Sequence, residues 1–389
     1  MLFNKGNGEP LIRTVKRNDL NGWQKLLVRA ICVATAIVLC IILLAIIGQK
    51  DPFPAVDYLF KGSFQNKYKF RQSLEEMVLL LGIAVALAPA YQMRFWNVGA
   101  QGQILMGAMG CSLVMIYGSH LPNWFVIILS LLTAMLFGGI WGLIPAFFKA
   151  KWNTNETLFT LMMNYIAIQI VSFATLNWKG ANSSMSIING STKVGWLPTI
   201  GGNAVILPLI IVLVLTVAMT IYLRYTKQGY ELQVIGESLN TARYTGIKVS
   251  WSIMRTMIIS GALCGLIGFI YVAGIDHKIS TDTSGGYGFT AIIVAWLANF
   301  NPLMMIAFSS LIVFLDRGAI NLNNVAYAPA LNDYSCEILV FVFIICIMLS
   351  EFFIRYRLLW RTPIKKTVAA KDEVTIVRKD DAKGGERHE

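Results

Sequence analysis

Charged residues are scarce in this chain, at 14% of 389 residues, whereas about a quarter of an average soluble domain is charged. The three histidines, His120, His277 and His388, lie far apart. The six cysteines lie singly, without the spacing of a metal site or of a disulfide framework. We therefore expect no metal site and no disulfides, and we expect the excess of apolar residues, 56% of the chain, to face lipid.

Motifs of the common enzyme classes are also missing. The chain has no Gly-rich loop ending in Lys-Ser or Lys-Thr that would bind phosphates, so we expect that it does not hydrolyse ATP by itself. It has no His-x-x-His pair, no Cys-x-x-Cys pair and no Gly-x-Ser-x-Gly turn. The sequence therefore predicts that the chain is not an enzyme, with no catalytic residue and no cofactor of its own.

The formal net charge is +12, from 33 basic and 21 acidic residues. The basic residues gather at the ends of the chain and between apolar runs, rather than in a soluble domain that could hold nucleic acid. Such an excess of Lys and Arg in short loops marks the cytoplasmic side of a membrane protein. We therefore attribute the charge to membrane topology and expect no nucleic-acid partner.

Long apolar runs are what the sequence has in abundance. A run of about 20 apolar residues is long enough to cross a hydrocarbon core roughly 30 Å thick. The pattern predicts an all-α, polytopic integral protein of the cell membrane, surrounded by lipid, with about ten transmembrane segments (eight to ten). The eighth is too short to span as a straight helix, so it is expected to be tilted, re-entrant or joined to its neighbour. The ten windows are 28–48, 74–93, 97–117, 123–148, 157–176, 204–224, 253–274, 287–299, 302–319 and 334–354.

The two ends of the chain are more basic and more polar than the middle. Basic residues precede the first apolar run and follow the last, which predicts that both termini are cytoplasmic. We divide the chain into a cytoplasmic segment over 1–27, a transmembrane domain over 28–355 and a charged cytoplasmic tail over 356–389. The stretch 49–72 disagrees with this topology, because it is expected to be an external loop and yet it is rich in Lys and Arg.

Polar side chains inside apolar segments are costly unless they pair or face a cavity. Asn97, Gln101 and Gln103 open the third segment, and Thr160 and Asn164 share one face of the fifth. Amides offer donors and acceptors without charge, which suits a path for a small, polar, uncharged solute. These five residues are the candidates for the substrate pathway. The alternative is that their hydrogen bonds only join helices, and the sequence leaves both readings open.

The longest internal polar stretch, 225–250, is expected to be a cytoplasmic loop between the sixth and seventh segments. Ser238 or Asn240 can cap a short helix that runs through Tyr244, and Gly246 can end it. Such a helix at the membrane surface could pass force from a soluble motor to the membrane helices. A simple connecting helix would show the same pattern, so the motif alone does not decide its role.

The run from Asn97 to Gln103 reads Asn-Val-Gly-Ala-Gln-Gly-Gln. It resembles the Asn-Ile-Gly-Ala-Glu-Gly-Gln motif of the permeases that serve branched-chain amino acids, ribose and related sugars, and nucleosides. This sequence departs from the family pattern at two places, because Gln101 stands at the motif's Glu and Ala298 stands where the family often has glycine. Three further stretches agree with the family in order and spacing, namely 155–167, 229–247 and 288–302.

The resemblance covers roughly residues 75–355 and looks closest to the nucleoside and simple-sugar branch. It implies a pair of permease subunits joined to two ATPase subunits, which bind ATP, and fed by an extracytoplasmic solute-binding protein. It also implies that the loop helix rests on an ATPase subunit. The coupling residues would then be Glu237, Asn240, Arg243, Tyr244 and Gly246.

We therefore predict the permease subunit of a binding-protein-dependent ABC importer, which forms the path for a small polar solute such as a nucleoside or a simple sugar. The alternative is a secondary transporter or channel for a small neutral solute that works without a motor. Such a carrier usually has a charged residue in mid-membrane, and the centres of the apolar windows are nearly free of charge. Neither the solute nor the choice between a homodimer and a heterodimer follows from the sequence.

Overall fold

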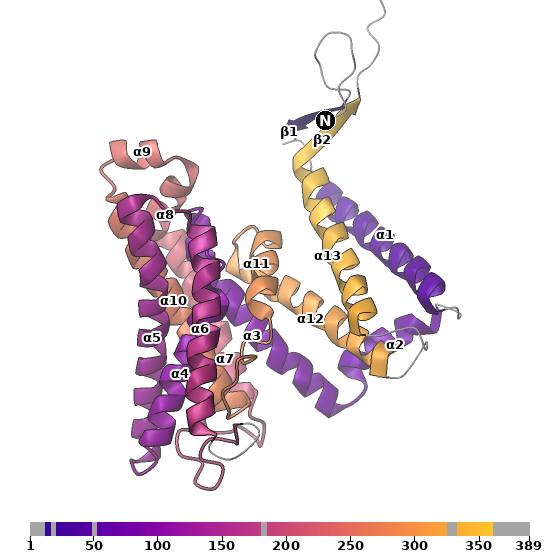
Figure 1. Cartoon of the computed structure of the whole chain (residues 1–389). Coiled ribbons are helices and arrows are strands. Elements are labelled where there is room, and N and C mark those ends of the chain that lie inside the picture. Colours follow the sequence, from indigo (N-terminus) through magenta and orange to yellow (C-terminus); the bar gives the residue numbers. More distant parts are fainter. Residues whose placement is uncertain (1–11, 17–20, 49–52, 180–184, 325–332, 361–389) are drawn as a thin grey trace, which may run out of the picture.

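The computed structural model describes residues 12–16, 21–48, 53–179, 185–324 and 333–360. Helices dominate this part of the chain, and one π-helical turn and two short strands complete it (Figure 1). In chain order the elements are β1 (Ile12–Lys16), α1 (Gly22–Gly48), α2 (Phe53–Phe64), α3 (Lys67–Gln92), α4 (Ala100–Tyr117), α5 (Asn123–Trp152), α6 (Glu156–Trp178), α7 (Ile206–Tyr225), α8 (Lys227–Glu237), α9 (Leu239–Tyr244), α10 (Val249–Phe269), η1 (Ile270–Ile275), α11 (Tyr287–Leu297), α12 (Pro302–Asn324), α13 (Asp333–Arg355) and β2 (Tyr356–Trp360).

Nine membrane-crossing candidates lie within the described residues: α1, α3, α4, α5, α6, α7, α10 with η1, α12 and α13. The prediction of an all-α multi-pass membrane protein is therefore confirmed. The eighth predicted window corresponds to α11, which at 11 residues is too short to span, as expected. A tenth crossing through the segment that contains α11 stays a prediction.

The two described ends of the chain lie side by side. β1 pairs antiparallel with β2, with Ile12 opposite Trp360 and Lys16 opposite Tyr356. Figure 1 shows this pair at the same end of the molecule as α9. Neither strand was expected, because the pairing joins the two extremes of the sequence and has no local signature. The charged tail beyond residue 360 lies outside the described residues.

Close helix packing through glycine holds the bundle together. Gly107 of α4 faces Gly265 of α10, and Gly138 of α5 faces Gly261 of α10. A Cβ atom at any of these positions would collide with the backbone of the facing helix. Small residues drive association inside a membrane because they let backbones approach closely. These four glycines therefore serve close helix packing.

The stretch 49–72 is not the loop that the sequence suggested. It contains α2 and the first turn and a half of α3, and Gly62 of α2 packs against the backbone of α12 near Gly318. Three of its basic side chains have polar partners: Lys61 lies 2.5 Å from the Asp57 carboxylate, Arg71 lies 3.1 Å from the Glu75 carboxylate, and the Lys69 ammonium donates to Asn321 Oδ1 at 2.5 Å. The conflict with the predicted topology is smaller than the count of charges suggested.

Candidate functional site

The short helix α9 forms where the local signals placed it. The Ser238 hydroxyl accepts from the backbone N–H of Thr241 at 3.3 Å, so Ser238 is the N-cap. The helix ends at Tyr244, and Gly246 follows with a φ of +81°, the left-handed conformation that closes many helices. The Ile247 N–H then bonds back to the Ala242 carbonyl at 3.0 Å.

Most of the surface of α9 is exposed. Ala242 is buried and anchors the helix, whereas the Tyr244 side chain is 91% exposed. The five residues that were predicted to couple to an ATPase lie in α9 or next to it, and all are exposed: Glu237, Asn240, Arg243, Tyr244 and Gly246. Three of them, Glu237, Asn240 and Arg243, also line a cleft between α9 and the ends of α3, α5 and α6. A role in coupling remains a prediction.

Beneath α9, the helix α8 is fixed to three long helices. Gly236 lies against the Gln92 carbonyl at the end of α3, where a Cβ atom would collide. Gly229 sits equally close to the last carbonyls of α7. The Glu231 carboxylate accepts from Arg255 of α10 at 3.2 Å, and both side chains are about four-fifths buried. A displacement of α8 therefore has to move α3, α7 and α10, or break these contacts.

A polar cleft of about 640 Å³ separates α9 from the ends of α3, α5 and α6. Arg94, Lys149 and Arg243 line it together with Glu156 and Glu237. The Lys149 ammonium lies 2.9 Å from the Glu156 carboxylate and so links α5 to α6 across their connection. The cleft gives α9 room to move relative to these helix ends.

The predicted pathway amides mostly bond to one another. Asn97 and Gln103 are buried and exchange two hydrogen bonds of 3.3 Å between their side-chain amides. The Tyr91 hydroxyl donates to the Asn97 carbonyl at 2.7 Å. Both amides therefore have partners within the protein, which is what a buried polar group in a membrane requires.

Two side chains of α6 complete this network from the neighbouring helix. The Asn164 amide accepts from the Gly102 N–H at 2.8 Å and donates to the Val98 carbonyl at 2.9 Å. The Thr160 hydroxyl accepts from the Val98 N–H at 3.1 Å. The first N–H groups of a helix have no partner within it, so these side chains satisfy donors at the start of α4 and tie α4 to α6.

Gln101 differs from the other four candidates. It is partly exposed, and Gly288 of α11 lies against its backbone, where a Cβ atom would stand 3.1 Å from the Gln101 Cβ. The network thus gathers Asn97, Gln103, Thr160 and Asn164 but leaves out Gln101. Lining of the solute path by these five residues stays a prediction.

One ion pair inside the apolar layer was not singled out from the sequence. The Arg317 guanidinium of α12 makes a two-pronged ion pair with the Glu76 carboxylate of α3, with Nε 2.5 Å from Oε2. Both side chains are more than four-fifths buried. The signal was present, because both residues fall inside apolar windows where charge is expensive. Their pairing was not visible, since the two residues are 241 positions apart.

Comparison with known proteins decides the family. A family model described as branched-chain amino acid transport system / permease component matches residues 72–349. This match spans well over half of the chain and runs from the start of α3 into α13. The chain belongs to this permease family. The motif at the start of α4, the α8–α9 element and α11 all fall within the matched part of the permease.

Three curated relatives show what this permease is similar to. It is 26% identical to the nucleoside ABC transporter permease protein NupB of Lactococcus lactis, over 85% of this chain and 95% of that protein. It is 28% identical to the guanosine ABC transporter permease protein NupP of Bacillus subtilis, over 77% and 86%. It is 26% identical to the glucose ABC transporter permease protein TsgB13 of Haloferax volcanii, over 79% and 83%.

Proposed function

We propose that this permease is the membrane subunit of an ATP-driven importer and that its solute is a nucleoside or a simple sugar. The observation that carries the proposal is an exposed helix, α9, fixed through α8 to three membrane helices of an established permease family. The names of the relatives, which refer to nucleosides, guanosine and glucose, support the choice of solute.

We place α9 on the cytoplasmic side, where a soluble ATPase would contact it. Arg94, Lys149, Arg224, Lys227 and Arg243 all lie at or near the end of the molecule that carries α9, and such an excess of basic residues favours the cytoplasmic face. The strands β1 and β2, the two described ends of the chain, lie at this same end, which supports assigning them to the cytoplasmic side as well.

Separate ATPase subunits would bind and hydrolyse ATP, and this chain would carry no cofactor. Glu237, Asn240, Arg243, Tyr244 and Gly246 would form the contact surface for one of these subunits. When nucleotide binding moves the ATPase, α9 would follow, and α8 would transmit the displacement to α3, α7 and α10. The membrane helices would then switch the path from outward-open to inward-open.

The complete importer would contain a second permease subunit and an extracytoplasmic solute-binding protein. A heterodimer is the arrangement we favour, because each of two organisms contributes two different nucleoside or guanosine permeases that resemble this chain. NupB and NupP match over 77% or more of the chain, whereas NupC of Lactococcus lactis and NupQ of Bacillus subtilis match over 53%. This difference suggests two permease types, with this chain closer to the first.

The amide network would serve the path indirectly. Asn97, Gln103, Thr160 and Asn164 fix the start of α4, and this helix begins next to Gln101 and α11. Gln101 is the member of the set with exposed surface, so it is the one we expect to meet the solute. The other four would act by holding α4 in place.

Co-purification tests the proposal. The permease is extracted in mild detergent with a tag, and its partners are identified by mass spectrometry. An ATPase subunit in near-stoichiometric amount is expected with the wild-type chain and should be depleted in Tyr244→Ala, which removes an α9 side chain that is 91% exposed. Tyr68→Ala, an exposed tyrosine of α3 outside α9, is the matched control. Isolation without any ATPase, combined with uptake driven by an ion gradient, would support the secondary carrier instead.

A further inference from the structure

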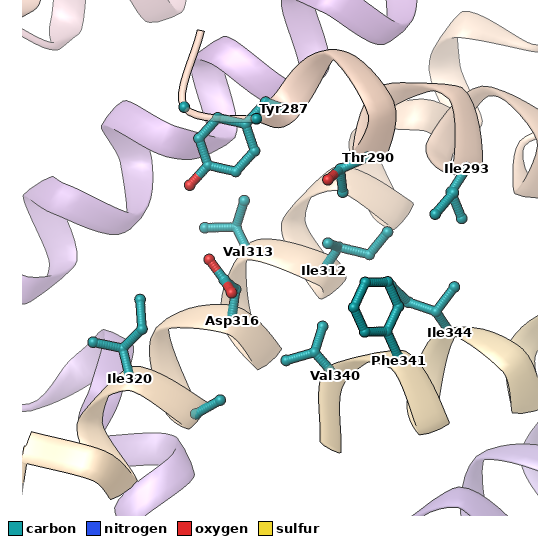
Figure 2. A pocket seen from close by; sticks show the side chains of 13 residues that line it. Tyr287, Thr290, Ile293, Ile312, Val313, Asp316, Ile320, Val340, Phe341 and Ile344 are labelled. Carbon is teal, nitrogen blue, oxygen red and sulfur yellow. The ribbon is translucent and has the colours of Figure 1, made fainter. Parts of the chain in front are cut away.

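A second cavity lies between α11, α12 and α13 and has a volume of about 650 Å³ (Figure 2). Most of its wall is aliphatic or aromatic, and its polar side chains are Tyr287, Thr290 and Asp316. Figure 2 shows the Asp316 carboxylate and the Tyr287 hydroxyl directed toward the same space. Ligand sites typically have this size and this mixture of an apolar wall with a few convergent polar groups.

The backbone is open to solvent or ligand at one edge of the cavity. Gly285 and Gly286 both have positive φ, +55° and +73°, and a Cβ atom added at Gly286 would meet nothing within 4 Å. The half-helix α11 begins immediately after them. Ser284, the residue before them, is 3% exposed, and its Oγ is among the described buried atoms that have no hydrogen-bond partner. Transporters often place a broken helix of this kind at the solute site.

Asp316 is the charged residue among those that line the cavity. Tyr287 lies beside Glu76 and Asp316, and Arg317 pairs with Glu76. A carboxylate in an apolar layer marks a water-filled cavity or a path for polar solutes. Lipid acyl chains have no hydrogen-bond donors for the Asp316 carboxylate. Lipid is therefore a poor occupant for the part of the cavity next to Asp316.

We propose that this cavity holds the transported solute during its passage, and this assignment rests on the proposed import function. The solute is a neutral molecule of nucleoside size that is rich in hydroxyl groups. Asp316 accepts hydrogen bonds from those hydroxyls, and Thr290 adds a donor and an acceptor. Phe341, which lines the cavity from α13, covers the apolar face of the sugar or base. The Asp316 carboxylate disfavours phosphorylated derivatives, because like charges repel.

Transport per ATP in the complete complex tests the assignment. The wild-type importer, reconstituted with its binding protein and ATPase, is compared with Asp316→Asn and Thr290→Val, using radiolabelled guanosine and glucose as probes. We expect solute moved per ATP to fall about tenfold in Asp316→Asn and severalfold in Thr290→Val. Asp57→Asn on α2 and Thr256→Val, a buried threonine of α10 that bonds only within its own helix, are the matched controls.

Thiol labelling gives a second readout that does not depend on turnover. A cysteine introduced as Thr290→Cys should react with a small water-soluble thiol reagent, guanosine or glucose should slow this reaction, and the corresponding phosphate esters should not. Ser309→Cys, buried inside α12, should remain unlabelled. Normal transport per ATP in both cavity variants, or labelling that neither probe slows, overturns the assignment while the importer stands. Absence of ATP-driven uptake by the wild-type complex overturns the importer itself.

Discussion

Arg255 of α10 donates to the carboxylate of Glu231 on α8 at 3.2 Å, and this ion pair links the α8–α9 element to a long membrane helix. Both side chains are largely buried, so the removal of one partner leaves the other charge poorly solvated. The pair therefore offers a direct way to disturb the link between α9 and the bundle without altering the surface proposed to contact an ATPase subunit.

Charge exchange at this pair should separate coupling from folding. We expect Glu231→Gln to reduce ATP-driven uptake severalfold while ATPase binding persists, because the contact surface on α9 is untouched. The double exchange Glu231→Arg with Arg255→Glu should recover part of the activity. The same exchange at the exposed pair Asp57 and Lys61 should have little effect, since such pairs contribute at most about 1 kcal/mol. Uptake assays of the complete complex provide the measurement.

The conformation of Gly246 predicts a graded response. A Cβ atom at this position meets nothing within 4 Å, so substitution acts only through the left-handed backbone, at about 1–2 kcal/mol for most residues. Gly246→Val should therefore impair uptake and coupled ATP hydrolysis more than Gly246→Asn, because Asn tolerates this conformation. Solute capture by the binding protein should be unchanged in both. Equal activity of the two variants would show that the left-handed backbone of Gly246 does not matter for uptake.

The sequence predicts the short helix α9 but not the elements whose contacts join distant parts of the chain. Ser238, Gly246 and the short helix between them follow from capping rules that act over a few residues, and the structure has them where predicted. The sequence did not predict α2, because this helix packs against Gly318 of α12, which lies far away in the sequence. The pairing of β1 with β2 also joins distant segments, which no local pattern reveals.

The candidate site was predicted unevenly for the same reason. The polar residues of the Asn97–Gln103 motif and of α6 stood out because amides are rare in apolar segments, but their mutual hydrogen bonds became visible only in three dimensions. Asp316 lay at the edge of an apolar window and lacked a motif. The cavity that it lines is formed by three helices, so its shape depends on tertiary packing alone.

Asn164 tests whether the amide network holds the structure together. Asn164→Ala would leave the Gly102 N–H and the Val98 carbonyl without their partners, at a cost of about 1–3 kcal/mol. We expect a lower melting temperature for the purified permease, measured by a thermal-shift assay in detergent. Gln169→Ala, an exposed amide on the same helix, should melt like the wild type. An unaltered melting temperature in Asn164→Ala would argue against the structural role.

His277, in the loop after η1, gives the stability of the permease a pH dependence. Its ring stacks on Trp196 at 3.6 Å between ring centres, and burial lowers the pKa of His277 below its ordinary value of 6.5, with Asp276 opposing this shift. A lowered pKa means that the unfolded chain binds the proton more readily. Stability is therefore full above pH 6.5 and is lost as the pH falls from there through the folded-state pKa.

Melting temperatures at about pH 7.5 and about pH 5.5 would measure this contribution. The wild-type permease should lose more stability on acidification than His277→Asn, which does not titrate and which tolerates the left-handed backbone of this position, φ +53°. The buried threonine variant Thr216→Val, which retains His277, should show the same pH dependence as the wild type. Parallel curves for His277→Asn and the wild type would show that other groups set the pH dependence.

The dependence of uptake on separate ATPase subunits most sharply distinguishes an ATP-driven importer from a secondary carrier. Guanosine and glucose uptake would be measured in proteoliposomes that contain this permease alone, with and without an imposed ion gradient, and in proteoliposomes that contain the complete complex with ATP. We expect uptake of a probe only with the complete complex and hydrolysable ATP, and we expect its loss in the Tyr244→Ala variant. Full-speed uptake by the isolated chain without nucleotide would contradict this expectation.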